Sequence, residues 1–201
     1  LKFIGNLKYA QSEDKIFSID KNLKKFFKTK KIWCASSTHK TEEIFCGLAH
    51  LRLKKKFKNL LTIIIPRHIE RIEEIKNDLE KINLKVHLHE PRSKINNDID
   101  IYLVNSYGKT KSFYNNCKNV FLGGSIINHG GQNPLEAVRY GCNILHGPYV
   151  KNFREIYDFL KKRKISSKIN NHNQLISNLN NNFLRNKKSN NKQGKLKLIG
   201  Q

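Results

Sequence analysis

Two closely spaced glycine pairs are the feature of this sequence that best fits ligand chemistry. They occupy positions 123–124 and 130–131, and the first pair follows a short apolar run at 120–122 that is typical of a buried strand. Each glycine costs backbone entropy, so this concentration of glycines needs a reason beyond a simple turn. Such a loop can bind phosphate through its bare backbone N–H groups. A tight turn without a ligand is the alternative interpretation.

A helix start follows the second glycine pair. Asn133 is a suitable N-cap, Pro134 and Leu135 fit the first turn, and Glu136 stands where a capping box has its acid. Gly141 predicts the end of this helix, because glycine easily adopts the left-handed conformation of a C-cap. The stretch therefore predicts a strand, a glycine loop and a helix whose positive dipole end faces the loop.

Other polar side chains also follow predicted strands. The clearest strand, at 60–65, is apolar on both faces and leads into Pro66 and Arg67. Proline fixes the direction in which the chain leaves the strand, and the planar guanidinium group can grip a phosphate. His39 follows a predicted strand at 32–35, and a role in a site or in a plain turn is equally open there.

Strands and helices alternate about six times along the chain. Apolar patterns predict strands at 32–35, 60–65, 84–89, 101–104, 120–122 and 142–146, and helices at 70–82, through 113–117, at 152–159 and at 172–184. A further helix follows the first strand, with Thr41 as its N-cap and Glu42 and Glu43 in its first turn, where they favour the helix dipole. This alternation predicts an α/β fold with a Rossmann-like, doubly wound, mostly parallel sheet. Because parallel strands end at the same edge of a sheet, we expect the polar residues after them to meet there.

Five motifs, in this order, resemble the donor-binding half of the bacterial Kdo transferases, which move 3-deoxy-D-manno-octulosonic acid (Kdo) from CMP-Kdo to lipid A precursors. They are Gly5-Asn6-Leu7-Lys8, Ala35-Ser36-Ser37-Thr38-His39, Pro66-Arg67-His68, Ser106-Tyr107-Gly108 and the glycine-rich stretch that ends in Asn133-Pro134-Leu135-Glu136. The resemblance covers nearly the whole chain. It implies the C-terminal domain of a GT-B fold glycosyltransferase, and therefore only the second half of such an enzyme.

The resemblance also implies the residues of a donor site. CMP would be bound by Pro66, Arg67, Tyr107, Gly108, Lys109, Asn133, Pro134, Leu135 and Glu136. Lys8 would be the catalytic residue of this half, because a fixed ammonium group stabilises the negative charge that grows on the departing CMP. Glu136 would accept hydrogen bonds from the ribose hydroxyls, a role that competes with capping its own helix.

The implied reaction is an inverting transfer of Kdo to a hydroxyl of a lipid A precursor. Its base, a glutamate in the family, would belong to an N-terminal acceptor domain that this sequence lacks. No metal is implied, and no cofactor, since CMP-Kdo is the donor substrate. We expect the isolated half to be inactive, and a CMP-binding module without catalysis is the alternative interpretation.

The sequence departs from the family at one motif. The family pattern there is Asp-Thr-x-Gly-Glu-Leu, whereas this chain has Asn105 in place of the aspartate and Lys109 in place of the glutamate. The change removes an acceptor and adds a positive charge near a phosphate. Binding could be kept through a changed contact, or selection on the site could be relaxed.

The net charge of +23 over 201 residues indicates anionic partners. Nucleic acid is one candidate, but the lysines are spread along the whole chain rather than gathered in one segment. Phosphorylated lipid A in an anionic inner-membrane leaflet would suit a basic protein equally well. We therefore expect a membrane surface and no nucleic acid, and keep a basic nucleic-acid-binding protein as the less favoured alternative.

No apolar run is long enough to span a membrane, and the chain opens without methionine on Leu1. The sequence therefore reads as a fragment. By resemblance we expect it at the cytoplasmic face of the bacterial inner membrane, peripherally or through an anchor in the missing N-terminal part. We divide it into an interdomain segment at 1–30, a CMP-sugar-binding domain at 31–165 and an Asn- and Lys-rich helix and tail at 166–201.

Potential metal ligands are few and poorly spaced. His87 and His89 share one face of a predicted strand without a third ligand nearby, and Asp98-Ile99-Asp100 reads as a solvated entry to the next strand. The four cysteines have no Cys-x-x-Cys spacing and fall in predicted strands or helices, which indicates buried thiols: Cys34, Cys46, Cys117 and Cys142.

Overall fold

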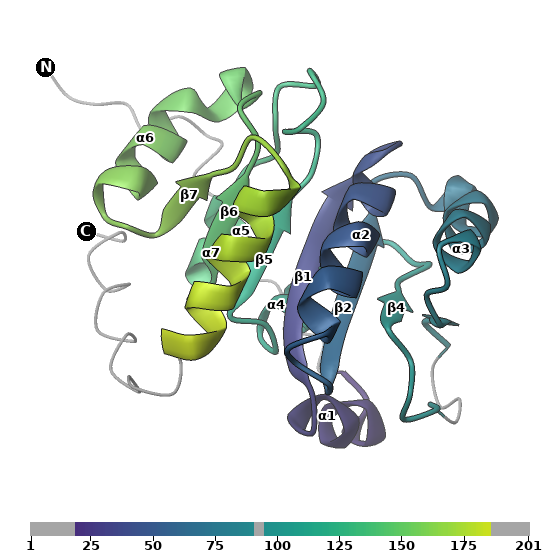
Figure 1. Cartoon of the computed structure of the whole chain (residues 1–201). Coiled ribbons are helices and arrows are strands. Elements are labelled where there is room, and N and C mark those ends of the chain that lie inside the picture. The colour runs from purple at the N-terminus through teal and green to yellow at the C-terminus, as the bar shows by residue number, and fades with distance from the viewer. Residues whose placement is uncertain (1–18, 91–94, 186–201) are drawn as a thin grey trace, which may run out of the picture.

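The computed structural model describes residues 19–90 and 95–185, which form a seven-stranded sheet flanked by helices (Figure 1). The described strands are all parallel, in the order β3-β4-β2-β1-β5-β6-β7. They are β1 (Lys31–Thr38), β2 (Leu60–Pro66), β3 (Val86–Leu88), β4 (Ile101–Leu103), β5 (Asn119–Leu122), β6 (Asn143–His146) and β7 (Ser166–Lys168). The predicted α/β class is confirmed.

Helices cover both faces of the sheet. Side chains of α2, α3 and α7 pack on one face, where Figure 1 shows α2 and the yellow α7 side by side, and α1, α4, α5 and α6 pack on the other. The helices are α1 (Lys21–Lys28), α2 (Glu42–Lys54), α3 (Ile72–Lys81), α4 (Thr110–Tyr114), α5 (Leu135–Arg139), α6 (Arg154–Lys162) and α7 (His172–Arg185), with short 3₁₀ turns η2 (Ile69–Arg71) and η3 (Lys151–Phe153).

Successive side chains of a strand point to opposite faces of the sheet and therefore enter two different hydrophobic clusters. In β2, Leu61, Ile63 and Ile65 face the cluster under α1 and α4, whereas Leu60 and Ile64 face the cluster under α2 and α3. This two-sided burial explains why the strand is apolar throughout.

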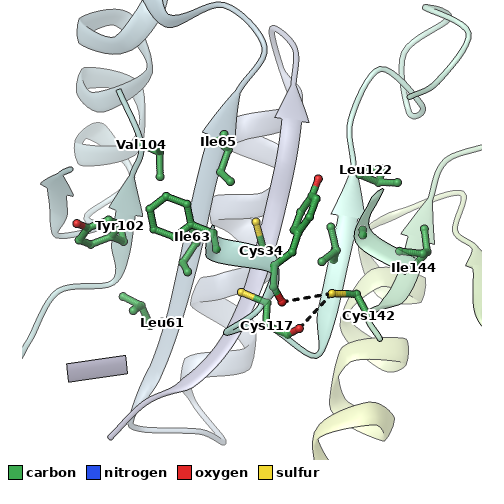
Figure 2. Packing of buried hydrophobic residues seen from close by; sticks show 14 of the residues in the cluster. Cys34, Leu61, Ile63, Ile65, Tyr102, Val104, Cys117, Leu122, Cys142 and Ile144 are labelled. Atoms are coloured by element: carbon green, nitrogen blue, oxygen red, sulfur yellow. Dashed lines mark hydrogen bonds between the residues drawn. The ribbon is translucent and has the colours of Figure 1, made fainter. Parts of the chain in front are cut away.

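The thiols are buried, as predicted. Cys142 lies within hydrogen-bonding reach of the backbone, with Sγ 3.2 Å from the carbonyl oxygen of Cys117 (Figure 2). All four cysteines are free and buried, and burial raises the pKa of the Cys46 thiol well above its ordinary value. They therefore act as small apolar core residues.

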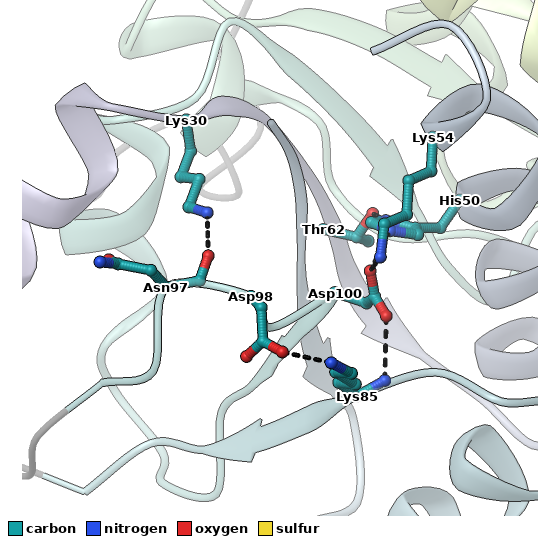
Figure 3. Close-up of polar contacts among 8 residues, drawn as sticks. All are labelled: Lys30, His50, Lys54, Thr62, Lys85, Asn97, Asp98 and Asp100. Carbon is teal, nitrogen blue, oxygen red and sulfur yellow. Dashed lines mark hydrogen bonds and ion pairs between the residues drawn. The ribbon is translucent and has the colours of Figure 1, made fainter. Parts of the chain in front are cut away.

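The interpretation of Asp100 as solvated is wrong. Its carboxylate is buried and accepts hydrogen bonds from His50 Nε2 at 3.2 Å, from the backbone N–H of Lys85 at 3.0 Å and from the Lys54 ammonium group (Figure 3). His50 in turn contacts the Thr62 hydroxyl at 2.8 Å. Only the first aspartate of the motif is exposed, so the second links α2 to the start of β4.

Two elements at the C-terminal end differ from the sequence prediction. Strand β7 has no apolar pattern and was not predicted, yet it pairs in parallel with β6. Helix α7 covers the predicted 172–184 and buries Leu175, Leu179 and Phe183 against α2 despite its asparagines. Packing of an apolar face outweighs the weak helix propensity of asparagine there.

The chain changes direction across the sheet at β1 and β5. From β1 it moves to β2 on one side, while β5 and β6 lie on the other side. Ligands of open α/β sheets bind outside the carboxyl ends of the strands at such a switch point. The loops after β1 and β5 therefore form the candidate ligand-binding region.

Candidate functional site at the switch point

The glycine loop after β5 is held against the end of β1. The N–H of Gly123 donates to the carbonyl of Ser36 at 2.9 Å, and a Cβ on Gly123 would lie 2.3 Å from the carbonyl oxygen of Ser37. Only glycine fits so close to a neighbouring backbone. The first glycine pair is thus explained by packing between two strands.

The N–H groups of this loop are occupied by a protein carboxylate. Glu42, fully buried, accepts hydrogen bonds from Gly124 at 2.7 Å, Ser125 at 3.1 Å and Ile126 at 3.0 Å, and from the N–H of His39 at 3.0 Å. Three successive N–H groups form a nest of the kind that binds anions. The prediction that they are bare and face a phosphate is therefore wrong, because Glu42 fills the nest.

The start of α2 also differs from the predicted cap. Thr41 has a left-handed backbone (φ 78°) and makes no side-chain cap bond. Glu43 is buried, and its Oε1 lies 3.2 Å from Nη1 of Arg71. The two acids after Thr41 hold tertiary contacts, in addition to the favourable position at the helix dipole that the sequence indicated.

The second glycine pair closes the loop. Gly131 donates to the carbonyl of Gly124 at 2.8 Å, and the carbonyl of Gly130 accepts from the N–H of Asn152 at 3.1 Å. Gly130 and Gly131 have φ values of +92° and +78°, which other residues rarely adopt. The loop is therefore a closed, tightly bonded structure that fixes the position of His129, just before it.

Three imidazole rings meet beside this loop. The ring centroid of His39 lies 4.2 Å from that of His129 and 5.5 Å from that of His68. His39 is buried, while the other two are exposed. Burial, reinforced by electrostatic interactions with His129, His68 and Arg67, lowers the pKa of His39 to about 4, so its ring is neutral at neutral pH. Among residues 19–90 and 95–185, no group hydrogen-bonds to its Nε2.

Arg67 lies at the end of β2, next to the end of β1. Its N–H donates to the carbonyl of Thr38 at 2.9 Å, while Pro66 before it is buried. The Arg67 side chain is exposed, and no carboxylate of the described residues forms an ion pair with it. Its guanidinium group is therefore available to a ligand at the switch point.

Tyr107, Gly108 and Lys109 form the loop after β4. Tyr107 is 62% exposed, and its hydroxyl is 3.5 Å from Oε2 of Glu70. Gly108 has a φ of +75°. Nζ of Lys109 lies 3.1 Å from Nε2 of His89, whose pKa burial and Lys109 lower to about 4. The neutral imidazole thus accepts from the ammonium group, which keeps further N–H groups for a ligand.

The predicted helix start is shifted by one residue, since α5 begins at Leu135, and Pro134, not Asn133, is its N-cap. Oδ1 of Asn133 still accepts a hydrogen bond from the N–H of Leu135 at 3.0 Å, and Glu136 lies in the first turn of α5. The helix ends at Arg139, and Gly141 follows with a φ of +73°. The hydroxyl of Tyr157 donates to the carbonyl of Gln132 at 2.9 Å and fixes the approach to this helix.

The sheet order places most predicted site residues along one edge. Strands β4, β2, β1 and β5 are neighbours, and the loops after them carry Tyr107 to Lys109, Arg67, His39 and Asn133 to Glu136, respectively. Lys8 lies outside the described residues. Sequence reasoning gave no site role to Glu42 or His129, although an acid three residues after His39 was a signal that could have been weighed.

Neither a metal centre nor a membrane helix was found in the described ranges. No group of three or more histidine, cysteine or acidic side chains there could hold a metal ion. None of the helices described is long and apolar enough to cross a bilayer. The prediction of a metal-free, cofactor-free site stays a prediction.

Sequence comparison finds relatives, although no protein-family model matches. The chain is 31% identical over 162 residues to the 3-deoxy-D-manno-octulosonic acid transferase of Haemophilus influenzae, a match that covers 80% of this chain and 38% of that protein. It is 29% identical over 145 residues to the enzyme of the same name from Aquifex aeolicus, covering 72% of this chain and 40% of that protein. The chain thus spans well under half the length of these relatives.

Solved structures with the same fold are also found. The C-terminal CMP-Kdo binding domain of WaaA from Acinetobacter baumannii matches with a TM-score of 0.79 at 22% identity, over 90% of this chain and 94% of that domain. The C-terminal domain of a glycosyl transferase group 1 family protein (LpcC) from Francisella tularensis matches with a TM-score of 0.50 at 12% identity, over 86% of this chain and 87% of that one. The predicted fold of a GT-B C-terminal domain is confirmed.

Proposed function

We propose, from the premise that this chain is a homologue of the 3-deoxy-D-manno-octulosonic acid transferases, that it supplies the donor-binding half of an enzyme that transfers Kdo from CMP-Kdo to a lipid A precursor. One observation carries the proposal. Four of the motifs that resemble the family lie within the described residues, at or just after the ends of β1, β2, β4 and β5, and the sheet brings these strand ends to one edge at its switch point.

The predicted residues on three loops receive roles in this proposal. Arg67, exposed at the end of β2, binds the phosphate of CMP with its planar guanidinium group. Lys109 adds a second positive charge from the loop after β4, next to Tyr107 and Gly108. Glu136 at the start of α5 accepts hydrogen bonds from the ribose hydroxyls, and Asn133, Pro134 and Leu135 shape the turn before it.

The remaining parts of the reaction lie outside the described residues. We assign transition-state stabilisation to Lys8, and the base to an N-terminal acceptor domain that binds the lipid. The transfer inverts the anomeric carbon and needs no metal. The basic charge of +23 favours attachment to the anionic cytoplasmic face of the inner membrane.

Calorimetric titration with CMP, using UMP and AMP as controls, tests the donor site. We expect selective CMP binding that weakens about tenfold or more in Arg67→Ala and in Glu136→Ala, because each change removes a charge-assisted contact. Arg52→Ala is the matched control, since Arg52 is exposed in the last turn of α2, at the opposite end of the helix from the site. Unchanged affinity in both site variants would contradict the assignment of the site.

The high positive charge also favours a second candidate, a nucleic-acid-binding protein. Its signature is an affinity for DNA that falls steeply with salt, because counterions are released from the phosphates on binding. Weak DNA binding of this kind together with tight, salt-insensitive CMP binding would exclude it. Tight DNA binding without nucleotide selectivity would favour it over the transferase.

A further inference from the structure

We propose that His39, His68 and His129, named here the histidine cluster, form a subsite for an oxyanion of the activated sugar donor. The identity of the donor rests on the proposed function, whereas the chemistry of the subsite rests on the cluster itself. The three rings come from the loops after β1, β2 and β5, which are neighbours in the sheet. The switch point therefore builds the cluster from three separate segments of the chain.

The buried nitrogen of His39 is the group that points to a ligand. His39 is 6% exposed, and its Nε2 has no hydrogen-bond partner within residues 19–90 and 95–185. A buried polar group without a partner is costly and needs an explanation. A Cβ on Gly124 would lie 3.3 Å from this nitrogen, so a side chain at position 124 would crowd it.

The charges around His39 favour an anion. The positive or titratable groups that act on it are Arg67 and His68 after β2, Arg71 in η2, and His129 in the glycine loop. The carboxylate nearest in the sequence, Glu42, already accepts four backbone hydrogen bonds. An oxyanion would find donors and positive charge here, while the oxygens of Glu42 are already occupied by backbone N–H groups.

Nearby acids pair with two of these groups. Glu70 lies 3.2 Å from Nδ1 of His68, on the exposed side of the cluster. Glu43 and Glu74 each lie 3.2 Å from the guanidinium group of Arg71. Arg67 forms no ion pair within the described residues, so its charge is the one that remains for an oxyanion beside His39. A bound oxyanion would add a negative charge beside the ring, stabilise the imidazolium form and raise the pKa of His39.

A CMP-activated sugar acid carries two oxyanions, the phosphate and the sugar carboxylate. Both accept hydrogen bonds from imidazole N–H groups, so the geometry of the cluster fits either. The two sources can be separated with small probes. CMP and inorganic phosphate carry only the first, free Kdo carries only the second, and cytidine carries neither.

Nuclear magnetic resonance of the imidazole protons tests the proposal directly. We expect the pKa of His39, about 4 without ligand, to rise by about one unit or more with a probe that carries the bound oxyanion, and to stay unchanged with cytidine. A rise with CMP and phosphate assigns the phosphate, and a rise with free Kdo assigns the carboxylate. If none of the probes changes the pKa of His39, the subsite is refuted.

Variants provide a second, independent readout. Glutamine can place its amide nitrogen near the position of Nε2, whereas asparagine reaches only the position of Nδ1. We therefore expect His39→Asn to weaken binding of the assigned probe about tenfold and His39→Gln to retain most of it. His172→Gln is the matched control, because His172 also has a Nε2 without a partner in the described ranges but packs against Phe45. Equal affinities for all four proteins, with unfolding curves that show them folded, would contradict the proposal.

The two proposals can fail separately. Selective CMP binding without any effect on His39 would leave the donor site intact and refute the subsite. A rise in the pKa of His39 with phosphate or Kdo, in a protein that shows no nucleotide selectivity, would refute the nucleotide site and support the subsite.

Discussion

Substitution of Glu42 by glutamine is the sharpest test of how the site is built. In the native protein Oε1 accepts from Ser125 and Ile126, and Oε2 accepts from Gly124 and His39. The amide of glutamine keeps one oxygen and replaces the other by an NH₂ group. Two of the four N–H donors would then face another donor instead of an acceptor.

The expected loss of stability follows from those two donors. Leaving one buried donor unpaired costs about 1–3 kcal/mol, so Glu42→Gln should destabilise the protein by about 2–6 kcal/mol. That is a large part of the roughly 5–15 kcal/mol that holds a typical domain together. The exposed Glu73 on α3 is the matched control, and Glu73→Gln should stay within about 0.5 kcal/mol of the native protein.

Urea unfolding followed by circular dichroism measures the difference, and hydrogen exchange places it in the structure. The amides of Gly124, Ser125 and Ile126 should lose protection in Glu42→Gln before the amides of β2 do. A change in stability below about 1 kcal/mol, with protection of the loop retained, would show that the carboxylate does not hold the loop.

Two further substitutions test the local backbone and the buried acid. Gly130→Ala should destabilise the protein more than Gly108→Ala, because a Cβ at 130 would lie 2.4 Å from Nδ2 of Asn152, whereas nothing lies within 4 Å of a Cβ at 108. The urea midpoints of the two variants measure this difference. Equal midpoints would mean that strain from the positive φ, which both glycines share, dominates. Asp100→Asn should cost stability at neutral pH, whereas Asp98→Asn, at an exposed ion pair, should cost little. The contacts with His50 and Lys54, against the opposing effect of burial, hold the pKa of Asp100 below its ordinary 3.8, so its contribution is present above pH 3.8 and is lost as the pH falls below it. Unfolding curves between pH 7 and pH 2 should therefore converge for the native protein and Asp100→Asn, and a constant gap would contradict this reading.

The regular part of the fold could be predicted because its signals are local. The run at 60–65 is apolar on both faces because β2 is buried on both faces, and a single segment carries that information. The helix between Asn133 and Gly141 could be predicted from its cap signal, placed one residue too early, and from its terminal glycine, whose N–H donates to the carbonyl of Val138. From such elements the parallel sheet and its ligand-binding edge follow by general rules.

The missed features depend on contacts between distant segments. Glu42 and Gly124 are 82 positions apart, and an acid in the first turn of a helix already has a sufficient local explanation in the helix dipole. Asp100 is buried only because α2 brings His50 and Lys54 to it, 50 and 46 positions away. Strand β7 pairs through its backbone, so its side chains carry no strand pattern. In each case the sequence is compatible with several partners, and packing selects one.

Because Glu42 occupies the nest of N–H groups, an anion at this edge must bind elsewhere. A phosphate in the glycine loop would have to displace Glu42 from four backbone hydrogen bonds and leave a carboxylate buried beside it, which electrostatics strongly disfavours. The loop therefore serves as a rigid support, and side chains must supply the contacts to the ligand. Arg67, Lys109 and His39 are available for this, each on a different loop after a neighbouring strand. Recognition by side chains also explains how a lysine could replace the glutamate of the family at position 109 and still contribute to a site for an anionic donor.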